Sequence, residues 1–586
     1  PSPFTVVNST TPSKKPHTTP LQSITPSPGL QKKSSSGLSL SPSTAKYGER
    51  KGAGTTVQRY TPTSMDKDSA NSMFFVDNTK FDIASNAATK SKSNTNVSIS
   101  FDVPTPSFPY ATSNVTKHYK HMFTKTHERA MALDDNLTSL AKAMYEGSGG
   151  SDGGLFDNLT PVGVPEVSGN NVQVLGRICN EAHEGRINKT AVMLEGSRDE
   201  SGGRRVMVDL AAVKEYSLFP GQIVGIEGSC PGGRKIVAKK IMEGEKKPFH
   251  QESVRDIMKY NHSTEYKDGE PLRIMSAAGP FTASGDLDFE PLKDLMGMME
   301  TIRPDVVILT GPFLSANHDH VKNNMVELEA EDGERSVVTF ETLFSEKITG
   351  IMEAPFSNTK GKLATKIVLV PSTEDAFHTS VFPQPPYEDR IPGGGKEMKV
   401  QGAEGMISGS LGIHYVESAG REGEAEPESR RIYTVSNPAT IKINDITIGI
   451  TSADPLTALG THETSLNISR MHRLSQHLIN QQSYYPLFPA PDGPNNISLD
   501  LGQMEKWRMP VTPDILIVPS KLAYFAKEVA GCVVVNSNSL AKGNTGGSYA
   551  CISVKPVARE SLEDKDGDLM QEARAAERTA VEIKKI

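Results

Sequence analysis

Two apolar segments decide the fold, LRIMSAAGPF (272–281) and PDVVILTGPF (304–313), and each ends in Gly-Pro-Phe. Both have the length and apolar character of a buried strand. A buried strand that runs into a tight turn is where an α/β enzyme places its catalytic groups. Neither turn contains an Asp or a His. The two segments therefore predict an enzyme-like scaffold without the expected chemistry, which favours a structural role or a role in assembly.

Apolar segments continue to alternate with helical ones over residues 271–586, which predicts an α/β sandwich with helices outside. Four more strands are expected, namely TKIVLVPS (365–372), ATIKINDITIGITS (439–452), DILIVPS (514–520) and AGCVVVNS (530–537). The segment PLKDLMGMMETIR (291–303) is expected to be the crossover helix between the first two strands. Residues 388–430, rich in glycine and charge, are expected to be an insertion in a surface loop.

Five short strand-like segments precede this domain. They are VQVLGRICN (172–180), AVMLEGSR (191–198), RRVMVDL (204–210), QIVGIEGSC (222–230) and RKIVAKKIMEG (234–244). An insert, AAVKEYSLFPG (211–221), follows the third, and this pattern predicts an OB-fold barrel over 165–245. OB-folds bind single strands by stacking bases on aromatic side chains, but here Tyr216 and Phe219 lie in the insert. The barrel is therefore expected to be a structural platform, with weak DNA contact at most.

The N-terminal 115 residues differ in composition from the rest of the chain. They are dominated by Ser, Thr, Pro, Asn and Lys without apolar periodicity, which predicts a disordered tail over 1–115. A helix and a Gly-rich linker are expected over 116–164, because apolar residues recur at helical spacing up to position 146 and GSGGSDGG (147–154) follows. Since the chain begins at Pro1 and not at Met, we expect a segment to precede it.

Eight Ser/Thr-Pro pairs occur in the tail, which predicts a regulated segment. Thr11-Pro12-Ser13-Lys14 has a basic residue two places after the proline, the pattern that cyclin-dependent kinases prefer. The phosphorylation candidates are Thr11, Thr19, Thr25, Ser27, Ser41 and Thr61. Each phosphate adds about −1.5 to −2 charge, so a cyclin-dependent kinase is an expected partner of the tail.

The net charge of −7 is unevenly distributed. Residues 1–110 contain 12 Lys/Arg and 6 Asp/Glu, a net charge of +6, so the remainder carries −13. A body this acidic argues against tight, unspecific DNA binding, which needs clustered cations, and suits protein partners. The four cysteines show no C-x-x-C spacing and indicate reduced thiols of an intracellular protein. No apolar run has the ~20 residues that a membrane span requires.

Five motifs occur together in one order and spacing. They are SLFPGQIVGIEG (217–228), RPDVVILTGPFLSANHDHV (303–321), VFPQPPY (381–387), QSYYPLFP (482–489) and VTPDILIVPSKLAYFAKEVAGCVVVN (511–536). From about residue 116 to 556 the chain resembles the B-subunit family of DNA polymerase alpha. The resemblance implies a multi-domain α+β chain: a disordered N-terminal tail, an OB-fold β-barrel, and a calcineurin-like phosphoesterase α/β sandwich that lacks its metal site. The family's N-terminal helical domain has no counterpart here.

The resemblance also identifies the positions at which an active phosphoesterase would hold two metal ions. Asp-x-His is replaced by Ala-Gly-Pro-Phe (278–281), Gly-Asp by Gly-Pro (311–312), Gly-Asn-His-Asp/Glu by Pro-Ser-Thr-Glu-Asp (371–375) and Gly-His-x-His by Pro-Ser-Lys-Leu (519–522). The degenerate positions are Gly279, Pro280, Gly311, Pro312, Ser372, Thr373, Ser520 and Lys521. Glu374 and Asp375 remain, but two carboxylates cannot build the binuclear centre that makes a hydroxide nucleophile. No catalytic residue, metal or cofactor is predicted.

One histidine pair resembles a metal cluster. His318 and His320 flank Asp319 directly after the second turn. On a helix, residues i and i+2 point to different sides, so the two imidazoles would not easily share an ion. Asp319 is expected instead in the first turn of a helix, where its charge suits the helix dipole.

Three functions compete. The resemblance implies a non-catalytic scaffold subunit of the DNA polymerase alpha–primase complex. That subunit grips the zinc-containing C-terminal domain of the catalytic subunit, reaches the primase subunits through the complex, and supports primer synthesis at replication initiation in the nucleus. One alternative is the B subunit of polymerase delta or epsilon, although SYYPLFP (483–489) and the Ser/Thr-Pro tail favour alpha. The other alternative is an active metallophosphoesterase, which the missing ligands oppose.

Overall fold

The computed structural model describes residues 47–63, 65, 96–101, 119, 121, 123–147, 159–166, 169–181, 186–323, 326–329, 335–388, 411–419, 430–491, 497–563 and 565–586. The phosphorylation candidates Thr11, Thr19, Thr25, Ser27 and Ser41 lie outside these residues, as does most of the segment expected to be a tail.

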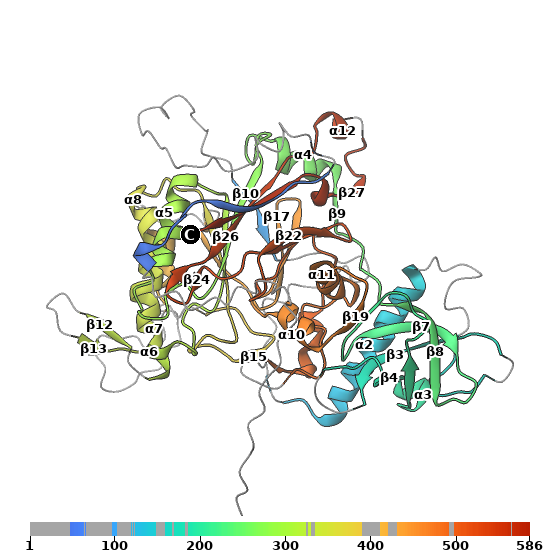
Figure 1. Cartoon of the computed structure of the whole chain (residues 1–586). Coiled ribbons are helices and arrows are strands. Elements are labelled where there is room, and N and C mark those ends of the chain that lie inside the picture. Colours follow the sequence, from blue (N-terminus) through green and yellow to red (C-terminus); the bar gives the residue numbers. More distant parts are fainter. Residues whose placement is uncertain are drawn as a thin grey trace, which may run out of the picture. The chain divides into compact units, whose positions relative to one another are not determined.

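Two β-sheets pack face to face to form the sandwich (Figure 1). The first sheet has seven strands, β1 (Thr56–Tyr60), β28 (Thr579–Lys585), β26 (Ser548–Val554), β10 (Leu272–Ala278), β11 (Val306–Thr310), β14 (Lys366–Val370) and β16 (Ile432–Thr434), in that spatial order. The second has six, β2 (Ile99–Ser100), β17 (Ala439–Ile443), β18 (Ile446–Ile450), β21 (Ile515–Ile517), β23 (Cys532–Asn536) and β22 (Phe525–Val529). Strands β10, β11, β14 and β16 run parallel, as the alternation of strands and helices predicts.

Helices cover the two outer faces. Helix α5 (Glu290–Ile302) and α8 (Gly350–Asn358) lie on the seven-stranded sheet. Helix α10 (Pro455–His462) and α11 (Arg470–Asn480) lie on the six-stranded sheet. Helix α5 confirms the expected crossover, because Leu292, Leu295, Met296 and Met299 form one buried stripe at helical spacing. No helix within the described part of the chain is long and apolar enough to cross a bilayer.

The segment 439–452, which was expected to be one strand, forms a hairpin of two strands. Residues 439–452 form β17 and β18, which pair antiparallel around a turn at Asn444 and Asp445. Asn444 has a φ of 55°, a left-handed conformation that Asn tolerates better than most residues. Its side-chain oxygen also accepts a hydrogen bond from the Ser98 N–H at 2.9 Å. An Asn-Asp pair between two apolar runs was the signal for this turn.

Two short stretches of the expected disordered tail belong to the fold. Strand β1 pairs antiparallel with β28, and β2 pairs antiparallel with β17. The 3-10 helix η1 (Tyr47–Glu49) precedes β1, and the buried Tyr47 hydroxyl donates to Asp294 of α5 at 2.8 Å. The prediction of disorder over 1–115 is therefore wrong for residues 47–63 and 96–101. Their apolar content is too low to signal a strand locally, because edge positions on existing sheets supply their partners.

The prediction of a surface-loop insertion over residues 388–430 is also wrong in part. Within 388–430, helix α9 (Ile413–Ser418) packs against the core beneath the seven-stranded sheet through Leu411, Ile413 and Val416. The Arg431 guanidinium donates to the carbonyl oxygens of Val416 at 3.3 Å and Ala419 at 2.6 Å. Residues 389–410 and 420–429 lie outside the described residues.

The predicted barrel is present with the expected five strands. Its closed order is β3 (Val172–Asn180), β4 (Val192–Glu195), β5 (Arg205–Asp209), β8 (Lys235–Met242) and β7 (Ile223–Ser229). The β5–β8 pair is parallel and the other pairs are antiparallel, which is the pairing of an OB-fold. Helix α2 (Thr126–Gly147), part of the helix expected over 116–146, packs on the barrel through Leu137, Leu140 and Met144.

The barrel insert joins the barrel to the sandwich. Its strand β6 (Tyr216–Leu218) pairs antiparallel with β19 (Thr464–Leu466), which follows α10. Gln481, at the end of α11, accepts a hydrogen bond from the Ile223 N–H at 2.8 Å and donates to the carbonyl oxygen of Ile223 at 2.9 Å. The insert is thus a docking strand, and backbone and side-chain hydrogen bonds fix it to the sandwich.

A buried polar cluster lies at this joint. The Ser217 hydroxyl lies 2.7 Å from His477 Nε2 and donates to Glu463 at 3.2 Å, so Nε2–H of a neutral His477 donates to Ser217. Burial, together with the charge of Arg473, lowers the pKa of His477 to about 3. Burial, together with the nearby Glu463 carboxylate, raises the pKa of Glu243 from 4.5 to about 7.

We predict that Glu243→Gln stabilises the chain at pH 8 and has little effect at pH 4.5. The folded carboxyl holds its proton up to about pH 7, whereas the unfolded one loses it near pH 4.5. The free energy of unfolding therefore falls as pH rises between these values, and a neutral side chain avoids the loss. We expect a gain on the order of 1–3 kcal/mol at pH 8, measured by urea denaturation.

Glu215→Gln is the matched control, because Glu215 is exposed on the barrel insert. Equal effects of the two substitutions at pH 8 would mean that the pKa of Glu243 is not raised in the folded chain.

Candidate functional site

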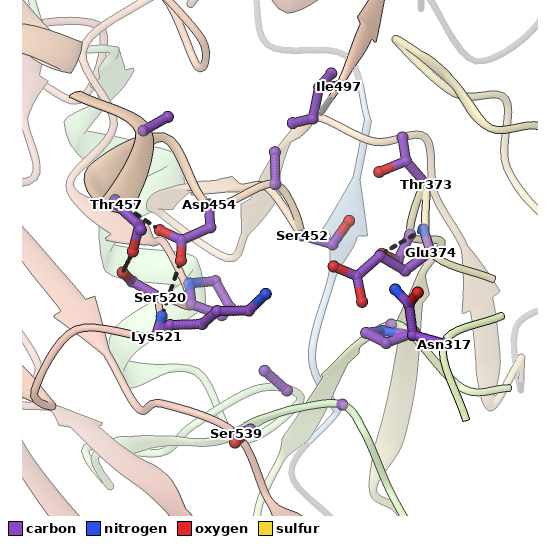
Figure 2. A pocket seen from close by; sticks show the side chains of 18 of the residues that line it. Asn317, Thr373, Glu374, Ser452, Asp454, Thr457, Ile497, Ser520, Lys521 and Ser539 are labelled. Atoms are coloured by element: carbon purple, nitrogen blue, oxygen red, sulfur yellow. Dashed lines mark hydrogen bonds between the residues drawn. The ribbon is translucent and has the colours of Figure 1, made fainter. Parts of the chain in front are cut away.

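A cavity of about 440 Å³ opens where strands β10, β11, β14, β18, β21 and β23 reach their carboxyl ends (Figure 2). This is the edge at which α/β sheets gather ligand-binding residues. The degenerate positions from the sequence all line it, namely Gly279, Pro280, Gly311, Pro312, Ser372, Thr373, Ser520 and Lys521. The structure thus brings together the four loops that the motifs assigned to one lost metal centre.

The first two loops touch backbone to backbone. A Cβ placed on Gly279 would lie 2.0 Å from the carbonyl oxygen of Pro312. A Cβ on Gly311 would lie 2.7 Å from Asp375 Oδ2 and 2.9 Å from Ser372 Cβ. All three distances are shorter than a non-bonded contact allows. Neither position has room for a side chain, and the residue after Gly311, where the Gly-Asp motif has its ligand, is Pro312.

Asp375 is buried and binds the loops together. Its carboxylate accepts hydrogen bonds from the N–H groups of Phe313 at 2.6 Å, Leu314 at 3.1 Å and Ser372 at 2.8 Å. The Tyr387 hydroxyl donates to it at 2.6 Å. Burial raises the pKa of Asp375 to about 6, although these hydrogen bonds oppose the rise. Sequence reasoning treated Asp375 as a surviving acid of the site, whereas the structure places it behind the cavity wall as a support.

Two buried asparagines hold the loops after β18 and β21 by accepting hydrogen bonds from them. The Asn437 side-chain oxygen accepts from the Thr451 hydroxyl and from the Ser452 N–H, both at 3.1 Å. The Asn536 side-chain oxygen accepts from the Ser520 N–H at 2.9 Å. The loops around the cavity are therefore held by side-chain acceptors that belong to the fold.

Asp454 is a cavity residue that sequence reasoning missed. It is the N-cap of α10 and accepts from the Thr457 N–H at 2.9 Å. Its second oxygen accepts from the Lys521 N–H at 2.9 Å, so it links the loops after β18 and β21. The Asp-Pro pair at 454–455 before an apolar run was a readable sign of this helix start.

Glu374 and Lys521 reach into the cavity from opposite walls (Figure 2). The Glu374 N–H donates to the Ser372 hydroxyl at 3.2 Å, and its carbonyl oxygen accepts from the Ala316 N–H at 2.8 Å. Among the described residues, no hydrogen bond to its carboxylate is found, so the carboxylate is presented to the cavity. No set of three His, Cys, Asp or Glu side chains within the described ranges could hold a metal ion.

The histidine pair after β11 is structural. Asp319 lies in the first turn of α6 (Asp319–Lys322), which confirms its expected place. His318 is the N-cap; its Nδ1 accepts from the His320 N–H at 3.3 Å, and its Nε2 donates to the carbonyl oxygen of Ala283 at 3.0 Å. Both ring nitrogens of His318 are therefore engaged within the fold.

Comparison with known proteins gives consistent matches. The family model of the DNA polymerase alpha/epsilon B subunit matches residues 274–527, and that of the OB domain of the DNA polymerase alpha B subunit matches 156–244. The DNA polymerase alpha B subunit of Rattus norvegicus is 32% identical over 440 residues, which cover 74% of this chain and 62% of that protein. The same subunit of Schizosaccharomyces pombe is 28% identical over 484 residues, which cover 80% and 73%.

Other matches are weaker. The subunit of Saccharomyces cerevisiae is 24% identical over 477 residues, which cover 75% of this chain and 60% of that protein. A solved archaeal phosphodiesterase covers 51% of this chain and 98% of its own at 9% identity, but its TM-score of 0.21 is too low to bear on the fold. The chain spans about three fifths of the length of the rat and budding-yeast relatives.

The two family models differ in the polymerases that they cover. The family model that matches the sandwich covers both alpha and epsilon subunits, whereas the family model that matches the barrel is the one for alpha. The curated relatives from rat and from both yeasts are alpha subunits as well. The chain belongs to the family of DNA polymerase alpha B subunits.

Proposed function

We propose that this chain is a non-catalytic accessory subunit of the DNA polymerase alpha–primase complex. The observation that carries the proposal is the edge of the cavity, where Pro280 and Pro312 stand in two of the four metal-binding motifs and close packing leaves no room for a side chain at Gly279. A binuclear centre needs those ligands to generate its nucleophile. The retained fold therefore serves as a scaffold, which fits the membership of this chain in the B-subunit family.

The proposed partner is the C-terminal domain of the polymerase catalytic subunit, and contact with primase would run through the complex. The β6–β19 pairing joins the barrel to the sandwich, so both can present one continuous surface. A permanent interface of this kind buries on the order of 2,000 Å² or more. The net charge of −13 on residues 111–586 suits a basic partner domain. Such a subunit acts in the nucleus at the initiation of replication.

The barrel is assigned to protein contact and not to base stacking. Tyr216 and Phe219, the aromatics of its insert, are buried at the joint with 5% and 0% of their surface exposed. The Phe219 ring lies 4.8 Å from the His477 ring, centroid to centroid. Neither ring can stack on a base, which is how OB-folds hold single strands. Any DNA contact would therefore rest on weaker electrostatic attraction.

We predict that the chain forms a one-to-one complex with the C-terminal domain of the catalytic subunit, and that deletion of residues 1–43 leaves the complex intact. A longer deletion, of residues 1–62, removes η1 and β1 and exposes the edge of β28. We expect it to lower the melting temperature of the free chain by several degrees, because a sheet edge and Tyr47 lose their partners. Size-exclusion chromatography measures complex formation, and thermal unfolding measures the melting temperature. Loss of the complex on deletion of 1–43 would place the contact in the tail.

Two glycine substitutions test how closely the loops after β10 and β11 are packed. We predict that Gly279→Ala and Gly311→Ala each lower the free energy of unfolding by about 1–3 kcal/mol or more, because the added methyl group meets backbone or buried atoms. Gly297→Ala is the control, since Gly297 is exposed in α5 and no atom lies within 4 Å of the place that an added Cβ would take. We expect it to be neutral or stabilising by up to about 1 kcal/mol. Chemical denaturation measures the free energy of unfolding of all three variants, and equal values would mean that the two loops are not closely packed.

We propose further that a cyclin-dependent kinase modifies the tail at Thr11, Thr19, Thr25, Ser27 and Ser41. Thr61 differs from them because it follows β1 directly, and although Thr61 is exposed, Pro62 is buried. A proline-directed kinase must contact that proline. We predict that kinase treatment modifies Thr61 in a synthetic peptide of residues 55–67 and leaves it unmodified in the folded chain. Mass spectrometry measures the phosphorylation of Thr61 in the peptide and in the folded chain. Equal phosphorylation of the two would show that β1 detaches readily.

A further inference from the structure

Several backbone N–H groups of the loops around the cavity are already used within the fold. Four side chains of the fold, Asp375, Asn437, Asn536 and Asp454, accept from the N–H groups of the loops around it. In an anion-binding site these are the groups that would point at the ligand. These backbone donors are therefore not available to a phosphate, which leaves side-chain donors such as the Lys521 ammonium.

Acceptors, by contrast, are presented to the cavity. The Glu374 carboxylate projects into it from the loop after β14 (Figure 2). His462, at the end of α10, also lines the cavity, and its Nδ1 lies 2.9 Å from the carbonyl oxygen of Ala458. With Asp454 and Lys521, the cavity carries two carboxylates and one ammonium, a net charge of −1.

Part of the remaining wall is apolar. Tyr485 and Ile497 line it together with alanines and prolines, and its volume of about 440 Å³ is within the range of ligand sites. A ligand with an aliphatic stem would bury the stem on this wall, as lysine and arginine side chains do elsewhere. An aromatic ring in the wall also favours a cation over an anion.

We infer that the cavity binds an organic cation, a guanidinium or primary ammonium group on an aliphatic stem, with the Glu374 carboxylate as its main acceptor. The place at which the resemblance would put two metal ions thus becomes a site for a single positive group. Two sources share this chemistry, the arginine or lysine side chain of a polypeptide and a free polyamine. The inference is independent of the proposed scaffold function, since the site needs no polymerase subunit.

The test measures binding to the full chain by isothermal titration calorimetry with three probes: N-acetyl-L-arginine amide, spermidine and inorganic phosphate. We expect both cations to bind saturably and phosphate not to bind. Glu374→Gln should weaken cation binding at least tenfold, because a charge-assisted hydrogen bond is lost. Ala316→Trp, at an exposed position on the rim, should weaken it by obstruction without disturbing the core.

Glu215→Gln is the matched control, because it removes one charge from an exposed site outside the cavity and should leave cation binding unchanged. Stronger binding of the arginine probe would assign the site to a polypeptide, and stronger binding of spermidine would assign it to a polyamine. Equal affinity of Glu374→Gln and the wild-type chain would overturn the inference, because the cations would then respond only to the overall negative charge. Phosphate binding in the absence of cation binding would overturn it as well.

Discussion

Backbone N–H groups at the ends of the strands must find acceptors, and the rest of this structure depends on how that need is met. Asp375 alone takes hydrogen bonds from three N–H groups in two loops, after β11 and after β14. A buried N–H without a partner costs about as much as a lost hydrogen bond, so these loops could not stay closed without such an acceptor. Because the acceptor is a side chain of the fold, loop geometry here does not depend on a metal ion. This explains how the scaffold can persist with its ligand positions replaced.

Local sequence signals predicted the parts of the fold that are stabilised locally. Continuous apolar runs marked β10 and β11, and the helical stripe marked α5, because burial on both faces or on one face leaves a periodic pattern. Strand β1 left no such pattern. It pairs with β28, so that Tyr60 lies opposite Val581, and the partner that stabilises it is more than five hundred residues away. No periodicity within a five-residue segment can encode a contact over that distance.

The candidate site, too, could be predicted from the sequence only in part. The eight degenerate positions lie around one cavity, because each follows a strand whose end is set by its own apolar run. The motifs could not separate the roles of Glu374 and Asp375, which are adjacent in sequence. In the structure one carboxylate reaches the cavity and the other turns behind its wall to hold two loops. Burial decides between the two roles, and burial depends on residues such as Tyr387 that belong to a different motif.

The joint between barrel and sandwich shows what such a scaffold requires in place of chemistry. An apolar contact alone would resist separation but would permit sliding, because the hydrophobic effect has no direction. The β6–β19 ladder and the two hydrogen bonds between Gln481 and Ile223 are directional and fix one register. The Ser217–His477 contact adds a buried hydrogen bond, which is directional as well. A protein that offers two domains to one partner gains from this rigidity, because their relative orientation need not be fixed again at the cost of binding free energy.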